Sequence, residues 1–179
     1  NNCDTILSFT ITEPPDLTAT YSITDVSCFG YCDGQIIITP VGGTPPYQYR
    51  IDGIQPSPYG PDSIFNSVCA NTYQWVWVKD DNGCKYRKIK EVEEPELLEI
   101  TDTVVTNITC YGDNDGSIVV TITGGTAPYT FSWYDSIMNP IITNTTSNLS
   151  DSLTNIPAGT YIVWITDSNQ CIISDTITI

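Results

Sequence analysis

Apolar and polar residues alternate along short stretches of this chain, and Gly, Pro, Asn and Asp separate one stretch from the next. Stretches of this kind, rich in Val, Ile, Thr, Tyr and Trp, are typical of β-strands bounded by turns. No window favours the 3.6-residue period of an amphipathic helix. The pattern predicts strands at 35–40, 47–51, 73–78, 85–90, 117–123, 129–133, 161–166 and 171–179.

The second half of the chain repeats the first. CFGYCDG at 28–34 recurs as CYGDNDG at 110–116, and GGTPPY at 42–47 recurs as GGTAPY at 124–129. ANTYQWVWVKDDNGC, which ends at Cys84, recurs as AGTYIVWITDSNQC, which ends at Cys171. The first residues also match those that follow Asn82, so we expect 1–17 to hold the last strand of a preceding repeat and a junction, with full repeats at 18–97 and 98–179.

Each repeat predicts one antiparallel β-sandwich of the immunoglobulin type, because turn signals recur every 8–12 residues within about 80 residues. Tyr129, Phe131 and Trp133 alternate along one stretch, so all three are expected to face a core. The matching residues of the first repeat include Tyr47, Tyr49 and Ile51, and there we expect Trp75 and Trp77 to supply core volume instead. The fold class is therefore all-β, with tandem sandwiches arranged head to tail.

Seven cysteines in a small all-β chain indicate disulfides and an oxidising compartment. The repeat register predicts the bonds Cys28–Cys84 and Cys110–Cys171, which join the same two landmarks in both copies. Cys32 and Cys69 occur only in the first copy and are predicted to form an additional bond. Cys3 matches Cys84 in register, so its partner is expected in a preceding repeat and it is predicted to be unpaired here.

The chain has 21 acidic and 6 basic residues, a formal net charge of −15 and no His. Nucleic-acid binding requires basic residues facing phosphates, and this composition excludes it. No apolar run is long enough to enter and cross a bilayer, so membrane insertion is not expected. Without His there is no Ser-His or Cys-His pair, and nothing singles out a carboxylate pair. We therefore expect neither an enzyme nor a catalytic residue.

Calcium is the one cofactor that the sequence leaves open. Asp113 and Asp115 resemble the start of an EF-hand loop, but its twelfth position is Gly124 rather than Glu. The favoured alternative is a tight turn in which the Asp accepts backbone N–H bonds and the following Gly supplies a positive φ. The acids near the junction, Glu91, Glu93, Glu94 and Glu96, are a second candidate calcium site, with a solvated charged face as the simpler interpretation.

The ordered pattern C-x-G-x-x-D-G-x-I, G-G-T-x-P-Y, A-G-T-Y and D-x-N-x-C resembles the SprB repeat family. It runs from Cys110 to Cys171 and again from Cys28, where Asn71 replaces the Gly that the family favours. The resemblance implies a tandem repeat from a long, extracellular cell-surface adhesin of gliding Bacteroidetes, exported by type IX secretion. It implies no catalytic residue.

The sequence thus predicts a stalk or spacer whose partners are neighbouring repeats of the same chain. Surface polysaccharide or the substratum would be contacted through other parts of the protein. A carbohydrate-binding module that stacks sugars on Trp164 or Tyr59 is the alternative from another class, and coplanar exposed aromatics would favour it. A linker made rigid by calcium is the third possible function.

Six Asp-Ser/Thr-apolar sequences resemble the O-glycosylation signal of the same phylum, and Asx-type turns are an alternative explanation for them. They predict glycans at Thr5, Ser63, Thr103, Ser136, Ser152 and Thr176.

Pro95 separates the two repeats, and modules in line predict a radius of gyration above ~20 Å. A single compact domain of this length would have about 16 Å.

Overall fold

The structure is a computed structural model, and it describes residues 8–52, 58–70 and 73–179. Within these ranges the chain forms thirteen β-strands and no helix. No helix that could span a membrane is found among the described residues. The all-β fold class expected from the sequence is confirmed.

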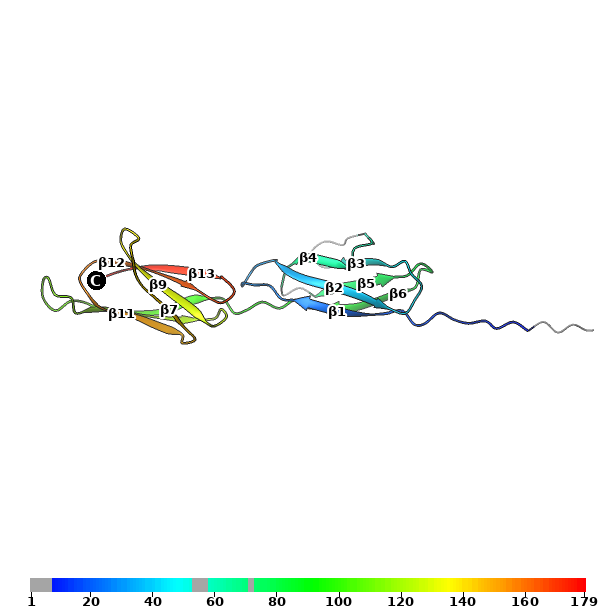
Figure 1. Cartoon of the computed structure of the whole chain (residues 1–179), viewed down its shortest axis with the longest axis horizontal. Coiled ribbons are helices and arrows are strands. Elements are labelled where there is room, and N and C mark those ends of the chain that lie inside the picture. The colour runs from blue at the N-terminus through cyan, green and yellow to red at the C-terminus, as the bar shows by residue number, and fades with distance from the viewer. Residues whose placement is uncertain (1–7, 53–57, 71–72) are drawn as a thin grey trace, which may run out of the picture. The chain divides into compact units, whose positions relative to one another are not determined.

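The first repeat contains two three-stranded sheets (Figure 1). One sheet has the order β1-β2-β4, formed by Thr18–Thr24, Gly34–Val41 and Ile64–Val68. The other has the order β3-β5-β6, formed by Gln48–Asp52, Gln74–Lys79 and Lys85–Lys90. Neighbouring strands of the second sheet are antiparallel.

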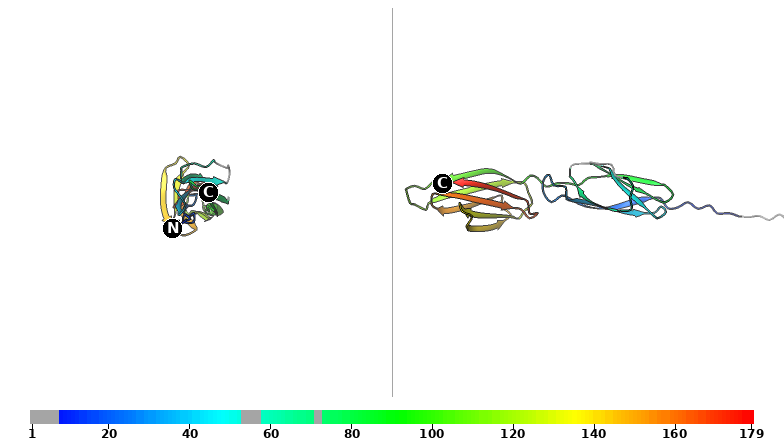
Figure 2. Two further views of the ribbon diagram at one scale, coloured as in Figure 1. Left: turned by 90° about the vertical axis from the view of Figure 1, so that its right-hand side faces the viewer. Right: turned by 90° about the horizontal axis from the view of Figure 1, so that it is seen from above.

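The second repeat contains the same two sheets with one strand added (Figure 2). The sheet β11-β8-β7 is formed by Ser150–Ile156, Gly116–Thr123 and Glu99–Thr106. The sheet β10-β9-β12-β13 is formed by Pro140–Thr146, Tyr129–Asp135, Thr160–Thr166 and Ile172–Thr178. This strand order, with antiparallel pairing throughout, is that of an immunoglobulin-like sandwich.

The core of the second repeat confirms the predicted aromatic face. Tyr129, Phe131 and Trp133 are all buried, the last two completely. They share one cluster with apolar residues of the opposite sheet, including Ile118 and Val120 of β8. Residues from both sheets therefore fill a single sandwich core, as the two-residue period of the strands requires.

The expected core role of the first repeat's tryptophans is wrong. Val76 and Val78 are completely buried, whereas Trp75 is 37% exposed and Trp77 is only half-buried. Because side chains alternate along β5, the tryptophans lie on the opposite face of the sheet from these valines. The smaller β-branched valines face the core of this repeat, so the size of a side chain does not indicate which face of the strand is buried.

All eight expected strands are present, and five more were not predicted: β1, β4, β7, β10 and β11. Most of these carry few buried residues, and β10 has none. These strands lie at sheet edges, and four of them lack the sustained apolar alternation on which the prediction rests, whereas β1 alternates but was missed. Residues 8–17, expected to include the end of a preceding strand, form no strand, and residues 1–7 lie outside the described ranges.

The contacts of the chain divide it into two compact units. The first unit holds Asn1–Ile23, Gln35–Asn66 and Thr72–Glu91. The second unit holds Val92–Ile179 together with Thr24–Gly34 and Ser67–Asn71, which belong to the first repeat by sequence. The second unit thus includes a loop that the repeat boundaries would assign elsewhere.

Candidate functional site

The first candidate site is the loop that carries the Cys-x-Gly-x-x-Asp-Gly motif, here named the CxG loop, at 27–34 and 109–116. In the first copy Asp33 accepts hydrogen bonds from the Ser27 backbone N–H at 2.9 Å and from the Ser27 hydroxyl at 2.5 Å. In the second copy Asp115 accepts the same two bonds from Thr109, at 3.0 and 2.6 Å. Each carboxylate therefore closes its own loop.

These bonds shift the pKa of both carboxyls. The side-chain hydroxyl bond, and then the backbone bond, hold the pKa of Asp33 and of Asp115 below the usual value of 3.8. The calcium candidate Asp113 also bonds within the loop, accepting from the Thr109 hydroxyl and the Cys110 backbone N–H, each at 3.1 Å. Among the described residues, no group of three or more acidic or cysteine side chains is arranged to hold a metal ion. One part of the turn interpretation, an Asp that accepts a backbone N–H bond within the loop, fits this geometry.

The role expected for the motif's second glycine is wrong. A positive φ occurs at Gly30 and Gly112, not at Gly34 or Gly116. Gly34 is required by space instead, because a Cβ there would lie 2.7 Å from Val92 Cγ1 and 2.8 Å from the carbonyl oxygen of Val68.

The second candidate site is the Asp-x-x-x-Cys hairpin turn, here named the Asp–Cys turn, at 80–84 and 167–171. Asp167 is buried and accepts backbone N–H bonds from Asn169 at 2.8 Å and Cys171 at 2.9 Å. Its other oxygen accepts from Thr126 N–H at 2.8 Å, which ties the turn to the loop at 124–129. Asp80 of the first repeat likewise accepts hydrogen bonds from the backbone N–H groups of Cys84 and Thr44.

The GGTxPY sequence forms the loop that these aspartates hold. Gly124 and Gly125 both have positive φ, as the turn interpretation requires. A Cβ on Gly124 would lie 2.0 Å from the carbonyl oxygen of Leu97, so the junction peptide passes directly over this loop. The Tyr129 hydroxyl donates to the Gly124 carbonyl at 2.8 Å, and Tyr47 donates to Gly42 at 2.7 Å in the first repeat. The motif thus fixes the entry of its repeat through bonds made within the fold.

The disulfides differ from two of the three expected bonds. Cys32 is bonded to Cys69, as expected. Cys28, however, is bonded to Cys171, and Cys84 and Cys110 are both free and exposed, so the predicted bonds Cys28–Cys84 and Cys110–Cys171 are wrong. Cys3 lies outside the described residues.

The geometry of the second repeat explains the error. The Cys110 loop precedes the first residue of β8. The Asp–Cys turn accepts a hydrogen bond from Thr126, which lies just beyond the last residue of β8. A strand of eight residues is about 26 Å long, and a disulfide requires Cα atoms within about 7 Å. Cys110 and Cys171 therefore lie at opposite ends of the same sandwich and cannot be bonded to each other.

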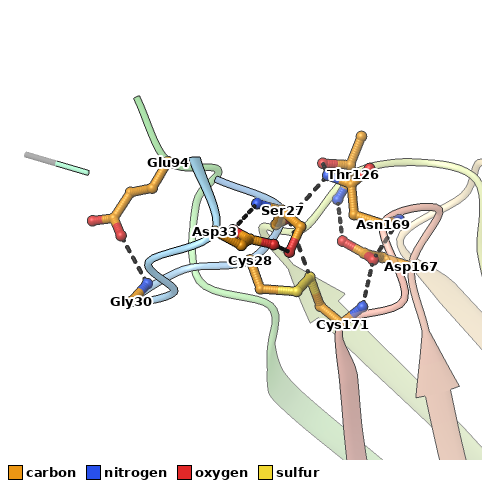
Figure 3. Close-up of a disulfide and its surroundings, with 9 residues drawn as sticks. All are labelled: Ser27, Cys28, Gly30, Asp33, Glu94, Thr126, Asp167, Asn169 and Cys171. Carbon is orange, nitrogen blue, oxygen red and sulfur yellow. Dashed lines mark hydrogen bonds between the residues drawn. A yellow bond between two sulfur atoms is a disulfide. The ribbon is translucent and has the colours of Figure 1, made fainter. Parts of the chain in front are cut away.

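Within the second unit, the first CxG loop is bound to the Asp–Cys turn by more than the disulfide (Figure 3). Asn169 donates its side-chain amide to the Ser27 carbonyl at 3.0 Å. Gly30 N–H donates to Glu94 at 2.8 Å, and Val26 N–H donates to the Glu93 carbonyl at 3.2 Å. Cys28 itself is buried. Of the junction acids considered above as a calcium site, the Glu94 carboxylate is an acceptor for this loop, and Glu93 accepts from the residue before it through its backbone carbonyl.

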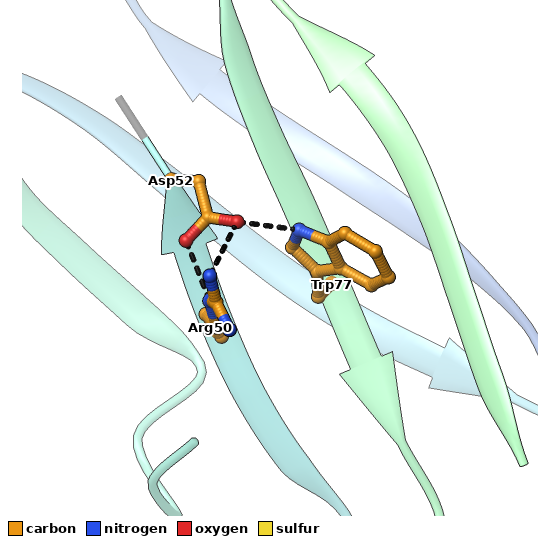
Figure 4. Close-up of polar contacts among 3 residues, drawn as sticks. All are labelled: Arg50, Asp52 and Trp77. Carbon is orange, nitrogen blue, oxygen red and sulfur yellow. Dashed lines mark hydrogen bonds and ion pairs between the residues drawn. The ribbon is translucent and has the colours of Figure 1, made fainter. Parts of the chain in front are cut away.

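On the outer face of the sheet β3-β5-β6, Arg50 and Arg87 lie against aromatic rings. Arg87 lies over Trp75 at 4.6 Å and over Trp77 at 5.0 Å from the ring centroids. Asp52 accepts from Trp77 Nε1 at 2.9 Å and from Arg50 through two bonds (Figure 4). Cation–π contacts and one ion pair thus hold Arg50 and Arg87 on the surface of their own sheet.

The aromatics named for sugar stacking do not form a flat platform. Trp164 is 43% exposed, but the nearby Tyr134 ring is inclined to it by 60° at a centroid distance of 5.9 Å. Tyr59 is half-buried, with Arg50 and Lys79 each within 6 Å of its ring centroid. Coplanar exposed rings were the feature that would favour carbohydrate binding, and neither residue provides them.

The glycosylation candidates differ in exposure. Ser136, Ser152 and Thr176 are exposed, whereas Ser63 and Thr103 are half-buried. Thr5 lies outside the described residues.

A protein-family model described as the SprB repeat matches the chain twice, at residues 20–56 and 103–136. The matched segments cover most of β1 to β3 and of β7 to β9, together with both CxG loops and both GGTxPY loops. No curated protein sequence matches the chain.

Several solved structures match the chain. A C-terminal 282-residue fragment of intimin, in complex with the translocated intimin receptor, has a TM-score of 0.46 and 14% identity over 93% of this chain. The BSP domain of a biofilm-associated protein has a TM-score of 0.31 and 15% identity over 89% of this chain. An amphioxus IgVJ-C2 molecule has a TM-score of 0.32 and 12% identity over 89% of this chain and 95% of its own. The chain spans 64% of the intimin fragment and 29% of the biofilm-associated protein.

Proposed function

We propose that this chain, which the SprB repeat model matches twice, is a structural spacer segment of a long, secreted cell-surface adhesin of the gliding-motility type, and not an enzyme. Its place would be outside the cell, after type IX secretion. The repeat identity supports the adhesin class, and the paired cysteines support an oxidising compartment.

One observation supports the spacer role. The side chains of the motifs that the two repeats share form hydrogen bonds within their own repeat. Asp167 holds a hairpin turn, Asp115 closes a loop, and Tyr129 holds the turn before its own strand. Residues repeated for a ligand would instead direct polar atoms into a common cleft. Repetition of a motif that only builds its module is what a spacer requires.

A replacement in the native host tests this role. Residues 18–179 would be exchanged for an unrelated pair of immunoglobulin-like domains of equal length. A spacer predicts that export, surface labelling and adhesion are retained, because only length and folding stability matter. Loss of adhesion with normal surface display would show that this segment itself binds the substratum.

The expected head-to-tail arrangement is a separate part of the proposal and rests on the sequence. Solution scattering of the chain would then give a radius of gyration above ~20 Å, since two sandwiches in line are longer than one compact body. A value near ~16 Å, the size of a single globule of this length, would contradict the spacer role.

A further inference from the structure

The surface beside the Asp–Cys turn is open in the first unit and covered by a CxG loop in the second. In the first unit, the junction peptide and the Asp–Cys turn line a groove of about 480 Å³, formed by Glu13–Thr18, Gly43, Asp80, Cys84, Lys85 and Tyr86. In the second unit the matching residues are Glu96–Leu98, Gly125 and Cys171–Ile173, and Cys28, Phe29 and Tyr31 of the CxG loop cover them. Only about 120 Å³ is left between the loop and that surface.

The groove of the first unit and the loop-covered surface of the second unit are held by the same hydrogen bonds. Gly43 N–H donates to the Pro15 carbonyl and Gly125 N–H to the Glu96 carbonyl, both at 2.9 Å, so the junction peptide is held alike in both units. Cys84 N–H donates to Asp80 at 2.8 Å and Cys171 N–H to Asp167 at 2.9 Å. The surfaces differ in that Cys171 is bonded to Cys28 and is followed by Ile172 and Ile173, whereas Cys84 is an exposed thiol followed by Lys85 and Tyr86.

The second CxG loop has the matching conformation. Asp113 N–H donates to the Cys110 carbonyl at 3.1 Å, as Tyr31 N–H does to Cys28 at 3.0 Å. Gly112 has the positive φ of Gly30, and Thr109 and Asp115 repeat the bonds of Ser27 and Asp33. Cys110 is a free, exposed thiol, and Tyr111, which corresponds to Phe29, is fully exposed.

We propose that the groove beside Cys84 is a docking and cross-linking site for the CxG loop of another SprB repeat, and that Cys110 is the cysteine which this chain offers to such a site. A second copy of the chain supplies that loop. The bond then formed, Cys84 to Cys110, would reproduce the Cys28–Cys171 bond, in which a CxG loop is joined to the Asp–Cys turn of the following repeat.

The chemistry is thiol–disulfide exchange with oxidised glutathione. One cysteine thiolate displaces one glutathione thiol to give a mixed disulfide, and the second thiolate then displaces the other glutathione. Two protein thiols lose two protons and two electrons in all, and one glutathione disulfide becomes two thiols. In the secretory compartment, the disulfide of a thiol oxidoreductase would supply the same two-electron oxidation.

Two single-thiol variants test the pairing, both carrying Cys3→Ser. One also carries Cys84→Ser and keeps Cys110; the other carries Cys110→Ser and keeps Cys84. Serine at an exposed free thiol should change the stability by less than ~0.5 kcal/mol. Each variant alone, and an equimolar mixture, would be equilibrated with reduced and oxidised glutathione and then analysed by non-reducing electrophoresis and peptide mass spectrometry.

The proposal predicts that the mixture forms a heterodimer linked through Cys84 and Cys110, in large excess over either homodimer. A statistical mixture of homodimers and heterodimers would show random collision of exposed thiols and would overturn the proposal. Absence of any dimer would overturn it as well.

Matched variants separate docking from simple thiol exposure. Tyr111→Ala in the Cys110 variant should slow heterodimer formation about five-fold or more, because Tyr111 takes the place of Phe29 against the groove. Ile137→Ala, at another exposed apolar residue, should leave the rate unchanged. Lys85→Glu in the groove should slow the reaction with the acidic loop about three-fold, and Lys88→Glu, outside the groove, should not. Equal rates for all four variants would contradict a docking site.

Discussion

Cys28 is bonded to Cys171, a residue 143 positions later in the chain. The bond joins the CxG loop of the first repeat to the Asp–Cys turn of the second, and both partners belong to the second compact unit. Their sequence copies, Cys110 and Cys84, are left free. This bond therefore joins one repeat to the next, whereas the Cys32–Cys69 bond lies within the first repeat.

Loss of this bond should destabilise the second unit. Cys171→Ser removes a covalent link across 143 residues, which should lower the free energy of unfolding by about 2–5 kcal/mol. Thermal denaturation followed by calorimetry would measure it, with Cys84→Ser as the control that leaves stability unchanged. Equal melting temperatures for both variants would show that the bond does not stabilise the fold.

Gly116→Ala should destabilise the second repeat through crowding. A Cβ at this position would lie 2.8 Å from the Ile156 carbonyl oxygen and 3.1 Å from Ile179 Cδ1. We expect a loss of about 1–3 kcal/mol in urea denaturation. Gly60→Ala is the matched control, because nothing lies within 4 Å of a Cβ there, and it should be close to neutral. A neutral Gly116→Ala would mean that β8 and β11 can move apart.

Asp167→Ala should be among the most damaging single substitutions. It leaves the backbone N–H groups of Thr126, Asn169 and Cys171 without their acceptor at a buried position. The expected loss is about 2–4 kcal/mol of unfolding free energy. Replacement of the exposed Asp102 by Ala should cost less than ~0.5 kcal/mol. Similar losses for the two variants would exclude a special role for Asp167.

Acidification should release the CxG loops only below the usual carboxyl range. The pKa of Asp115 is lowered in the folded chain, so its contribution to stability is complete above the usual value of 3.8 and is lost as the pH falls through the lower folded pKa. Thr109→Val removes the hydroxyl that is the largest cause of the shift and should move the pKa of Asp115 upward. Carboxyl NMR titration would measure this, with Asp33 as the internal control that stays unchanged.

Glycans, if the six Asp-Ser/Thr-apolar sequences are used, should occupy the exposed sites first. We predict modification at Ser136, Ser152 and Thr176 in protein from the native host, because a transferase must reach the hydroxyl. Intact mass and glycopeptide mapping would check it against protein from a host that lacks the pathway. A native mass equal to that of the bare chain would contradict the prediction.

Much of the local structure could be predicted from particular residues. Alternation placed Tyr129, Phe131 and Trp133 in the core, and the paired glycines at 124–125 have the positive φ that their turn requires. The same alternation could not tell which face of β5 is buried, because Trp75 and Val76 are both apolar. Three of the unpredicted strands, β1, β7 and β10, have no buried residue, and β4 and β11 have only one or two, so little burial was there to be read from the sequence.

The sequence by itself determined that the chain is a repeat, that each repeat is a β-sandwich, and where its turns lie, because these depend on neighbouring residues and on side-chain alternation. Only the tertiary structure decided which cysteines are bonded. In a periodic chain, pairing within one repeat and pairing with the next repeat satisfy the same register. The length of β8 distinguishes them, since it holds Cys110 and Cys171 at opposite ends of one sandwich, while the CxG loop of the preceding repeat lies beside Cys171.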